Sequence, residues 1–307
     1  MTLPFLDAEA LAGALPMPAA IDALEAALVA GLDPTADPMR TSVTTTTGQL
    51  LLMPSAAGAA VAVKLVSIAP GNPERGLPRI QGVVVLFDPV SLTPLALIDG
   101  AALTTLRTPA VSALAVRRVA AVDARRLVVF GSGPQADGHI AAMLAVRPIE
   151  RVTIVGRNAG TAEALAERWV RPGLAVRVGS AAEVADADLV VCATTAREPL
   201  FDGRLVRAGA CVVAVGSHEP DARELDAALV QRSWIVVEDV ATALREAGDL
   251  ILAGVAASGL VSLGELVAGR IPEHAGPPAG PLDGPTVIKT VGMAWQDAVV
   301  AAAAVAR

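Results

Sequence analysis

The sequence predicts an α/β protein of two domains, one built around a doubly wound parallel sheet and the other of α+β type. From residue 123 onward, short apolar strand patterns alternate with helical patterns, which is typical of right-handed βαβ units. Before about residue 118, helical patterns instead flank β-patterned segments joined by short turns, which indicates an antiparallel sheet. The 307 residues are enough for both domains.

The composition excludes several classes of protein. Apolar residues make up 53% of the chain, too many for a disordered protein, yet no run approaches the ~20 apolar residues that span a bilayer. The net charge of −7, without a basic cluster, disfavours nucleic acid and anionic membranes as partners. The N-terminus lacks the basic segment of a signal peptide, and Cys192 and Cys211 lie in apolar runs typical of reduced core residues, so we expect a cytoplasmic protein. His139, His218 and His274 are too far apart in sequence to form a metal motif.

Periodicity and turn residues predict the elements of the first domain. Helical spacing of apolar residues predicts helices over 7–31 and 101–120. Runs of β-branched and apolar residues predict four strand segments, at 40–56, 60–70, 83–88 and 94–100. A short turn joins the last two segments, and a Pro- and Gly-rich loop over 70–82 precedes them.

The same criteria predict the elements of the second domain. Residues 126–147 indicate a strand, a glycine-rich turn and a helix. The further strand segments are 151–158, 174–179, 188–194, 210–217 and 234–239, and the intervening helices are 159–169, 181–187 and 241–249. Residues 273–285 have the composition of a linker, and 285–307 indicate a short strand followed by a long helix.

The glycine-rich turn after the first of these strands has the pattern G-x-G-x-x-A. It consists of Gly131, Ser132, Gly133, Pro134, Gln135 and Ala136. In a Rossmann-type domain the first glycine permits the tight turn, the second lets a pyrophosphate approach the backbone, and the small third residue lets the helix pack on the strand. Because the motif follows an apolar strand and begins a helix, it indicates a dinucleotide site; the alternative is a tight turn without a ligand.

The end of the next strand indicates which dinucleotide binds. An acidic residue at this position would bind the ribose 2′-hydroxyl of NAD, but the strand ends in Gly156, Arg157 and Asn158. Arg157 is placed to pair with a 2′-phosphate. The sequence therefore favours NADP(H) over NAD(H), which stays open; the alternative is that Arg157 is a solvated charge.

Three cations of the first domain are flanked by small or apolar residues rather than by other charges. They are Arg40, Lys64 and Arg107. A site for a small carboxylate needs such a set, with a guanidinium fork and a second cation nearby. The alternative is that these cations pair with structural acids such as Asp88 or Asp99.

Lys64 lies within the apolar strand pattern AVAVKLVSIAP, where an ammonium group is costly to bury without a partner. Strand alternation places Lys64 on one face with Ala62 and Val66, opposite Val61, Val63 and Leu65. We expect one face to pack in the core while Lys64 points into a cleft.

Several long motifs together resemble the ornithine cyclodeaminase/mu-crystallin family from about residue 5 to the C-terminus. The motifs are VAVKLVS, LPRIQGVVVLFDP, LALIDGAALTTLRTPAVSALA, VVFGSGPQADGH, VGSHEPDARELD, LREAGDL and IKTVGMAWQDAVVA. The resemblance implies a substrate-binding and dimerisation domain over 1–118, to which 286–307 return, a Rossmann-type NAD(P)-binding domain over 119–285, and a homodimer. Members of the family act on an imine that lies next to a carboxylate.

The resemblance also implies roles for individual residues. Arg40, Lys64 and Arg107 match the positions that bind the substrate carboxylate and form the active site. Gly131, Gly133, Gln135 and Ala136 match the phosphate loop, and Arg157 and Asn158 match the 2′-phosphate site. The positions that match the remaining cofactor-binding segments are Thr194, Thr195, Val215, Gly216, Ser217, Val291 and Gly292.

The chain departs from the family pattern at two positions. His218 replaces the acidic residue that ornithine cyclodeaminases use to bind the distal amine of the substrate, and a histidine is a poor partner for an ammonium group. Arg79 and Ile80 replace a Ser-His pair of the mu-crystallin-like reductases. Arg79 is therefore either an additional substrate-binding cation or a solvated loop charge.

The resemblance implies an NAD(P)H-dependent reductase of a cyclic ketimine or other α-imino carboxylate, or a dehydrogenase of the matching amino acid. In that reaction Arg107 and Arg40 would hold the carboxylate, and Lys64 would donate a proton or orient a water. A lysine desolvated between two arginines is expected to have a lowered pKa. His218 is a second candidate proton donor. The alternatives are an ornithine cyclodeaminase that forms proline and ammonia with bound NAD, and a non-enzymatic NADPH-dependent binding protein.

Overall fold

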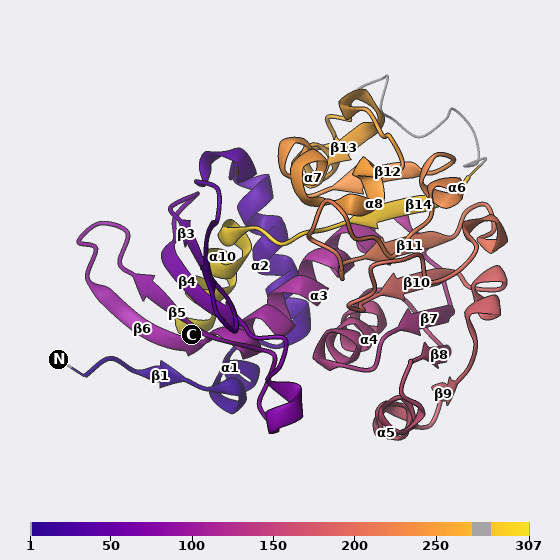
Figure 1. The fold of residues 1–307 in the computed structure, drawn as a ribbon. Helices are drawn as coiled ribbons and strands as arrows, with labels where there is room; N and C mark the ends of the chain where they lie inside the picture. Colours follow the sequence, from indigo (N-terminus) through magenta and orange to yellow (C-terminus); the bar gives the residue numbers. More distant parts are fainter. Residues whose placement is uncertain (1, 272–283, 307) are drawn as a thin grey trace. The chain divides into compact units, whose positions relative to one another are not determined.

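The computed structural model describes residues 2–271 and 284–306, which form two compact units (Figure 1). The first unit comprises Met1–Val111 and Gly292–Arg307, and the second comprises Ser112–Val291. Both predicted boundaries therefore need correction, because residues 112–118 and 286–291 belong to the second unit. The predicted linker at 273–285 lies outside the described residues except at its last two positions.

A six-stranded sheet forms the frame of the first unit. Its order is β1-β6-β5-β4-β3-β2, and it is antiparallel except that β1 runs parallel to β6. The strands are β1 (Phe5–Leu6), β2 (Thr41–Thr45), β3 (Gly48–Ser55), β4 (Val61–Ile68), β5 (Ile80–Phe87) and β6 (Pro94–Asp99). The antiparallel sheet predicted from the sequence is thus confirmed.

The helices of the first unit come from the first 120 residues and from the C-terminal segment. They are α1 (Ala8–Ala14), α2 (Met17–Val29), the first part of α3 (Gly100–Val119) and α10 (Ala294–Val305); short 3₁₀ turns cover Pro34–Ala36 and Pro73–Arg75. The helical pattern predicted over 7–31 forms two helices, which Pro16 separates because proline cannot continue a helix from the preceding turn. Within the described ranges no single helix is long and apolar enough to cross a membrane, although α1 and α2, which meet at 69°, pass that test of length and composition together.

The face of β4 that packs in the core is the one that carries Lys64. Ala62, Lys64 and Val66 are buried, whereas the opposite positions of β4 are only half-buried. The C-terminal helix α10, yellow in Figure 1, packs against β3, β4 and β5. The expectation that the face opposite Lys64 would form the core is therefore wrong, because α10 returns to the sheet and covers the face of Lys64.

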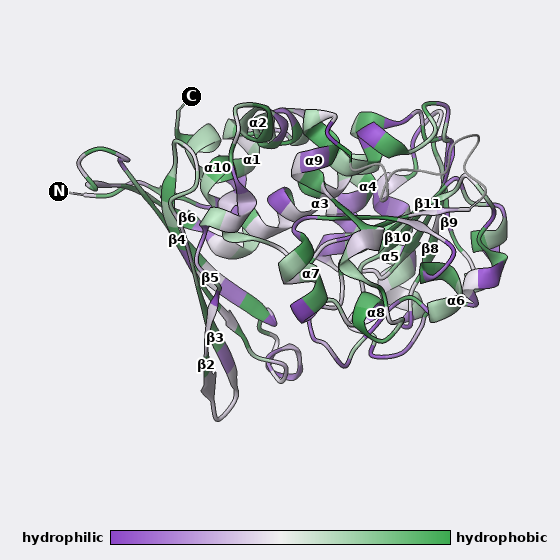
Figure 2. Ribbon diagram, turned by 90° about the horizontal axis from the view of Figure 1, so that it is seen from above, coloured by the Kyte–Doolittle hydropathy of each residue, from purple (hydrophilic) through white to green (hydrophobic). Residues whose placement is uncertain are grey.

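The opposite face of this sheet is apolar, and no described element of the unit covers it (Figure 2). Strand register places Leu52, Leu65 and Val83 side by side on this face. Towards its edges, Phe5 is 57% exposed and Val43 is 48% exposed. A contiguous apolar surface of this kind is typical of a protein interface.

An eight-stranded parallel sheet forms the second unit. Its order is β13-β12-β14-β11-β10-β7-β8-β9. The strands are β7 (Arg126–Phe130), β8 (Arg151–Val155), β9 (Ala175–Val178), β10 (Leu189–Cys192), β11 (Cys211–Ala214), β12 (Trp234–Val237), β13 (Leu260–Ser262) and β14 (Thr286–Lys289). The chain proceeds from β7 outward through β8 and β9, and then returns to β10 on the other side of β7. The topological switch point, where such folds bind ligands, is therefore between β7 and β10.

Helices and turns connect these strands. They are the second part of α3, α4 (Pro134–Val146), α5 (Ala159–Trp169), α6 (Ala227–Val230), α7 (Val240–Glu246), α8 (Gly248–Ile251) and α9 (Leu263–Ala268), with 3₁₀ turns at Ala181–Ala185, Gly203–Leu205 and Ala257–Gly259. The helix predicted over 181–187 is thus a 3₁₀ turn, which Ser180 and Glu183 cap reciprocally. Among the described residues, Cys192 and Cys211 are buried free thiols, as predicted.

Candidate functional site

A buried carboxylate binds two of the three predicted cations in the first unit. Asp297 Oδ2 lies 2.7 Å from Lys64 Nζ, and Asp297 Oδ1 lies 3.2 Å from Arg107 Nε. Arg107 Nη1 donates a second hydrogen bond to Gln296 Oε1 at 2.9 Å. Lys64, Arg107 and Asp297 are 2%, 6% and 1% exposed, so all three charges are removed from water.

Three different elements position these groups. Lys64 lies in the middle of β4, with Met53 of β3 and Val84 of β5 as its strand partners. Arg107 lies on α3, and Asp297 lies in the first turn of α10. A carboxylate near a helix N-terminus is also favoured by the helix dipole. The site therefore forms only when α10 packs on the sheet.

The third cation, Arg40, lies just before β2 and contacts the segment that precedes α10. Arg40 Nη2 donates a hydrogen bond to the carbonyl oxygen of Gly292 at 2.9 Å. Gly292 has a φ of +82°, and a side chain there would begin 2.7 Å from Arg107 Nη1. Gly292, which was predicted beside the cofactor, is thus a residue of the first unit that lets the two guanidinium groups approach the backbone.

The environment of Lys64 makes it suitable for proton transfer. Burial lowers the pKa of Lys64 to about 8; Asp297 opposes this shift, and the positive charges of Arg107 and Arg40 add to it. The predicted direction of the shift and its two arginine contributions are thus confirmed. With this pKa, Lys64 is mostly an ammonium group at neutral pH and releases its proton far more readily than an exposed lysine does.

The structural acids considered as partners of these cations are used elsewhere. Asp88 accepts hydrogen bonds from the backbone of Val90 and Ser91 in the turn between β5 and β6. Asp99 accepts hydrogen bonds from the backbone of Ala101 and Ala102 at the start of α3. The alternative interpretation, in which Asp88 or Asp99 pairs with these cations, is therefore wrong for both acids.

Asp297 was missed because the sequence places it far from its partners. It follows Gln296 inside the otherwise apolar helical stretch AWQDAVVAAAAV. The criterion that singled out Lys64, a charge among apolar neighbours, also applies to Asp297 and could have found it. Arg79, by contrast, is exposed before β5 and lies outside the cluster of Arg40, Lys64 and Arg107.

In the second unit, the glycine-rich turn has the geometry that a dinucleotide pyrophosphate needs. Gly131 has a φ of +112°, and a side chain there would lie 2.5 Å from the carbonyl oxygen of Ala193. At Gly133 an added Cβ would meet no atom within 4 Å, so the start of α4 is open on that side. Pro134 begins α4, and the backbone N–H groups of its first turn can receive an anion. Ala136 is buried between helix and strand.

The turn after β8 lies beside this loop. Ser132 Oγ and Thr161 Oγ1 are 2.7 Å apart, which joins the glycine-rich turn to the start of α5. Asn158 caps α5 by accepting a hydrogen bond from the backbone N–H of Thr161 at 3.1 Å. Arg157 is exposed. The structure thus brings Ser132, Arg157 and Asn158 to one edge of the sheet and leaves the Arg157 side chain accessible.

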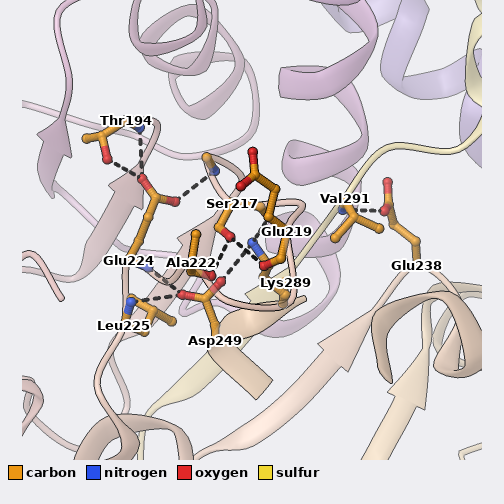
Figure 3. Close-up of polar contacts among 11 residues, drawn as sticks. Thr194, Ser217, Glu219, Ala222, Glu224, Leu225, Glu238, Asp249, Lys289 and Val291 are labelled. Atoms are coloured by element: carbon orange, nitrogen blue, oxygen red, sulfur yellow. Dashed lines mark hydrogen bonds and ion pairs between the residues drawn. The ribbon is translucent and has the colours of Figure 1, made fainter. Parts of the chain in front are cut away.

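The remaining predicted cofactor-binding residues follow β10, β11 and β14 at the carboxyl edge of the sheet (Figure 3). Thr194 and Thr195 follow β10; Val215, Gly216 and Ser217 follow β11; and Val291 follows β14. His218 is half-buried in the loop after β11. The backbone N–H of Val291 donates to Glu238 Oε2 at 2.7 Å.

Sequence reasoning also missed three buried ionisable residues of this edge. Glu224, Asp249 and Lys289 are at most 1% exposed. Lys289 Nζ lies 3.0 Å from Asp249 Oδ2, and Glu224 binds the loops after β10 and β11. Lys289 ends the apolar strand TVIK, so the criterion applied to Lys64 could have singled it out.

These two units define a class of protein in which a Rossmann-type unit, with a glycine-rich turn after its first strand, is joined to an α+β unit with a buried cluster of cations. The chain belongs to the ornithine cyclodeaminase/mu-crystallin family, whose family model matches residues 4–306. It is 38% identical over 253 residues to Δ1-pyrroline-2-carboxylate reductase 2 of Burkholderia ambifaria, covering 81% of this chain and 78% of that protein.

Two of the solved structures that share the fold match nearly their whole length. The first is the Δ1-pyrroline-2-carboxylate reductase of Thermococcus litoralis in complex with NADH and L-proline, with a TM-score of 0.90, 31% identity, and coverage of 99% of this chain and 97% of that one. The second is an archaeal alanine dehydrogenase dimer with bound NAD, with a TM-score of 0.90, 25% identity, and coverage of 100% and 96%.

Proposed function

We propose that the chain is an NAD(P)H-dependent reductase of a cyclic ketimine or α-imino carboxylate, which can also oxidise the matching amino acid. The observation that carries the proposal is the cluster of Lys64 and Arg107 around the single carboxylate of Asp297. Two buried cations that share one carboxylate leave one positive charge to be balanced, and a substrate carboxylate would balance it.

The residues of the cluster have distinct roles in this proposal. Arg107, whose Nε and Nη1 are held by Asp297 and Gln296, presents a fixed guanidinium to the substrate carboxylate, and Arg40 assists it. Lys64 donates a proton to the imine nitrogen or orients a water that does so. His218 is a second candidate donor, and the exposed Arg79 is proposed only as a cation that meets a distal group of the substrate.

The second unit fits a nicotinamide dinucleotide, which supplies the hydride when bound. The open start of α4 at Gly133 and the close approach at Gly131 suit the pyrophosphate. The relative from Thermococcus litoralis was solved with NADH and L-proline, which supports both a dinucleotide and a cyclic amino acid here.

The proposed function is tested by a screen of cyclic imino acids, and of keto acids with amines, in which the consumption of NADPH and NADH is measured, with ornithine as a parallel substrate. Cofactor consumption with a cyclic imino acid would support the reductase. Release of ammonia from ornithine without net cofactor turnover would overturn it in favour of a cyclodeaminase. Cofactor binding without consumption by any substrate would overturn it in favour of a binding protein.

We propose NADP(H) as the preferred cofactor, because Arg157 stands where NAD-binding domains often place an acid. Replacing Arg157 with Ala is expected to weaken NADPH binding roughly tenfold or more, since a charged hydrogen bond to phosphate is lost, and to leave NADH binding unchanged. Titration of both cofactors by fluorescence measures the difference. Equal NADPH affinities of the variant and the wild type would contradict the assignment.

We propose that the protein is a homodimer that uses the uncovered apolar face of the six-stranded sheet. The archaeal relative with bound NAD is described as a dimer, and the face includes Leu65 between Leu52 and Val83. Replacing Leu65 with Glu should place a charge in that interface and give a monomer in sedimentation velocity. The matched control is Val122→Glu, because Val122 is 81% exposed and lies outside this face. This control should leave the mass in solution unchanged. A dimeric Leu65→Glu variant would argue against this surface.

A further inference from the structure

Glu224 joins two loops of the second unit through both of its carboxylate oxygens (Figure 3). Oε1 accepts hydrogen bonds from the backbone N–H and the hydroxyl of Thr194, at 2.8 and 2.7 Å. Oε2 accepts one from the backbone N–H of Gly216 at 2.7 Å. Thr194 belongs to the β10 loop, residues 193–202, and Gly216 to the β11 loop, residues 215–226. One buried side chain therefore holds both loops.

The two loops approach each other too closely for an additional methyl group. A side chain at Gly216 would begin 2.2 Å from the carbonyl oxygen of Thr194 and 2.5 Å from Glu224 Oε1. On the other side of the β10 loop, the carbonyl of Ala193 lies against Gly131 of the phosphate loop. The β10 loop therefore begins directly beside the switch point between β7 and β10.

Asp249 and Lys289 hold the β11 loop, to which Glu224 belongs. Asp249 Oδ1 accepts hydrogen bonds from the backbone N–H groups of Glu224 and Leu225, at 2.7 and 2.9 Å. Lys289 Nζ lies 3.0 Å from Asp249 Oδ2 and donates to the carbonyl oxygen of Ser217 at 2.6 Å. The β11 loop is thus anchored at Gly216 by Glu224 and at Ser217 by Lys289.

Burying these charged side chains carries a large desolvation penalty, so the arrangement is an inefficient way to stabilise the fold. Burial raises the pKa of Glu224, while Lys289 and the hydrogen bonds from Thr194 act in the opposite direction. Apolar side chains at such positions often stabilise a fold as well as a buried ion pair does. Apolar side chains, however, cannot hold the backbone N–H groups of Thr194 and Gly216, which belong to two different loops, at defined positions.

We propose that Glu224 is a positioning residue for hydride transfer, which fixes the β10 and β11 loops against the nicotinamide part of the cofactor, with Asp249 and Lys289 supporting it. The proposal rests on the proposed function. It follows from the place of both loops at the carboxyl ends of the strands next to the switch point, where dinucleotides bind.

The decisive variant is Glu224→Gln, which keeps the size of the side chain. A carboxylate accepts at both oxygens, whereas the amide accepts at one and donates at the other, so one loop faces a donor in place of an acceptor. We expect kcat for ketimine reduction to fall roughly 10- to 100-fold, because small misplacements near the reacting atoms are costly. The primary isotope effect with 4-deuterated cofactor should rise, while cofactor affinity stays within about threefold, because the phosphate loop is intact.

Glu224→Asp separates positioning from packing. It retains two acceptors but removes a methylene, so a positioning role predicts higher kcat for the Asp variant than for the Gln variant, whereas a packing role predicts the reverse order. Arg197→Ala is the matched control, because Arg197 joins the same loops at the surface through Glu219 and Asp221, each at 2.6 Å. Exposed ion pairs contribute little, so this variant should behave like the wild type.

Amide hydrogen exchange of the cofactor-free protein provides a readout that does not need a substrate. Glu224→Gln should accelerate exchange in residues 193–202 and 215–226 while the rest of the second unit is unchanged. Wild-type exchange in both loops, or wild-type kcat and isotope effect in the Gln variant, would overturn the proposal.

The exchange experiment also separates this proposal from the proposed function. If the wild type reduced no imine, the proposed function would fail, and unchanged exchange in Glu224→Gln would show separately that Glu224 does not hold the loops. If the Gln variant did not fold, the Asp variant would decide: slower hydride transfer at unchanged cofactor affinity supports the proposal, and wild-type kinetics and exchange overturn it.

Discussion

Replacing Lys64 with Met is expected to lower kcat for the reduction of a cyclic ketimine by roughly 10²- to 10⁴-fold, the usual contribution of a positioned proton donor. Met has a similar length and no charge, and Arg107 still has Asp297 as its partner at 3.2 Å. The fold and the cofactor site of the second unit should therefore be retained. Steady-state kinetics with saturating cofactor measure the effect, and turnover close to the wild type would show that Lys64 is not the donor.

The pH dependence of the reaction provides an independent check on Lys64. Because the pKa of Lys64 is lowered to about 8, the ammonium form that donates a proton predominates below that pH and is lost above it. We therefore expect kcat/KM for reduction to fall as the pH rises through about 8 in the wild type. Lys64→Arg keeps the positive charge but cannot release its proton in this range, so this decline should be absent from its residual activity. A decline at the same pH in the wild type and in Lys64→Arg would assign it to a group other than Lys64.

Replacing Asp297 with Asn is expected to reduce the free energy of unfolding by about 3–5 kcal/mol, because the substitution leaves two buried cations without their shared carboxylate. Lys64 Nζ at 2.7 Å and Arg107 Nε at 3.2 Å would then face a neutral amide. The pKa of Lys64 should fall further, since Asp297 is the group that opposes the effect of burial. Urea denaturation at neutral pH measures the loss.

The double variant Lys64→Met with Asp297→Asn is the control for that prediction. Removing both partners takes away one of the two unpaired charges, so the double variant should be more stable than Asp297→Asn alone. If the free energies of unfolding of the wild type and of Asp297→Asn differed by less than about 1 kcal/mol, the ion pairs of Asp297 would be too well solvated to contribute to stability. Equal stability of the single Asn variant and the double variant would show that Lys64 and Asp297 are not coupled.

Much of the second unit could be predicted because its signals are local. The alternation of apolar strands with helices indicates parallel βαβ units wherever it occurs, and the turn from Gly131 to Ala136 is defined by steric requirements within six residues. The boundary of the unit could not be predicted in the same way. The strand Thr286–Lys289 inserts between β11 and β12, and only the pairing of distant segments places it there.

Only the cations of the candidate site in the first unit could be predicted from the sequence. A cation among apolar neighbours has to have a partner, so Arg40, Lys64 and Arg107 could be singled out from their surroundings in the sequence. Neither the partner nor the covered face of the sheet could be identified, because Asp297 lies 190 residues from Arg107 and enters the site only with α10.

The sequence by itself determined the two types of fold, the glycine-rich turn and the family, and it showed that three cations need a counter-charge. The tertiary structure alone decided that Asp297 meets this need, that α10 covers the Lys64 face of the sheet, and that Glu224, Asp249 and Lys289 hold two loops together. The physical reason is the range of the interactions. Hydrophobic periodicity and backbone sterics act between neighbours in the chain, whereas the compensation of a buried charge depends on whichever residue the complete fold brings within hydrogen-bonding distance.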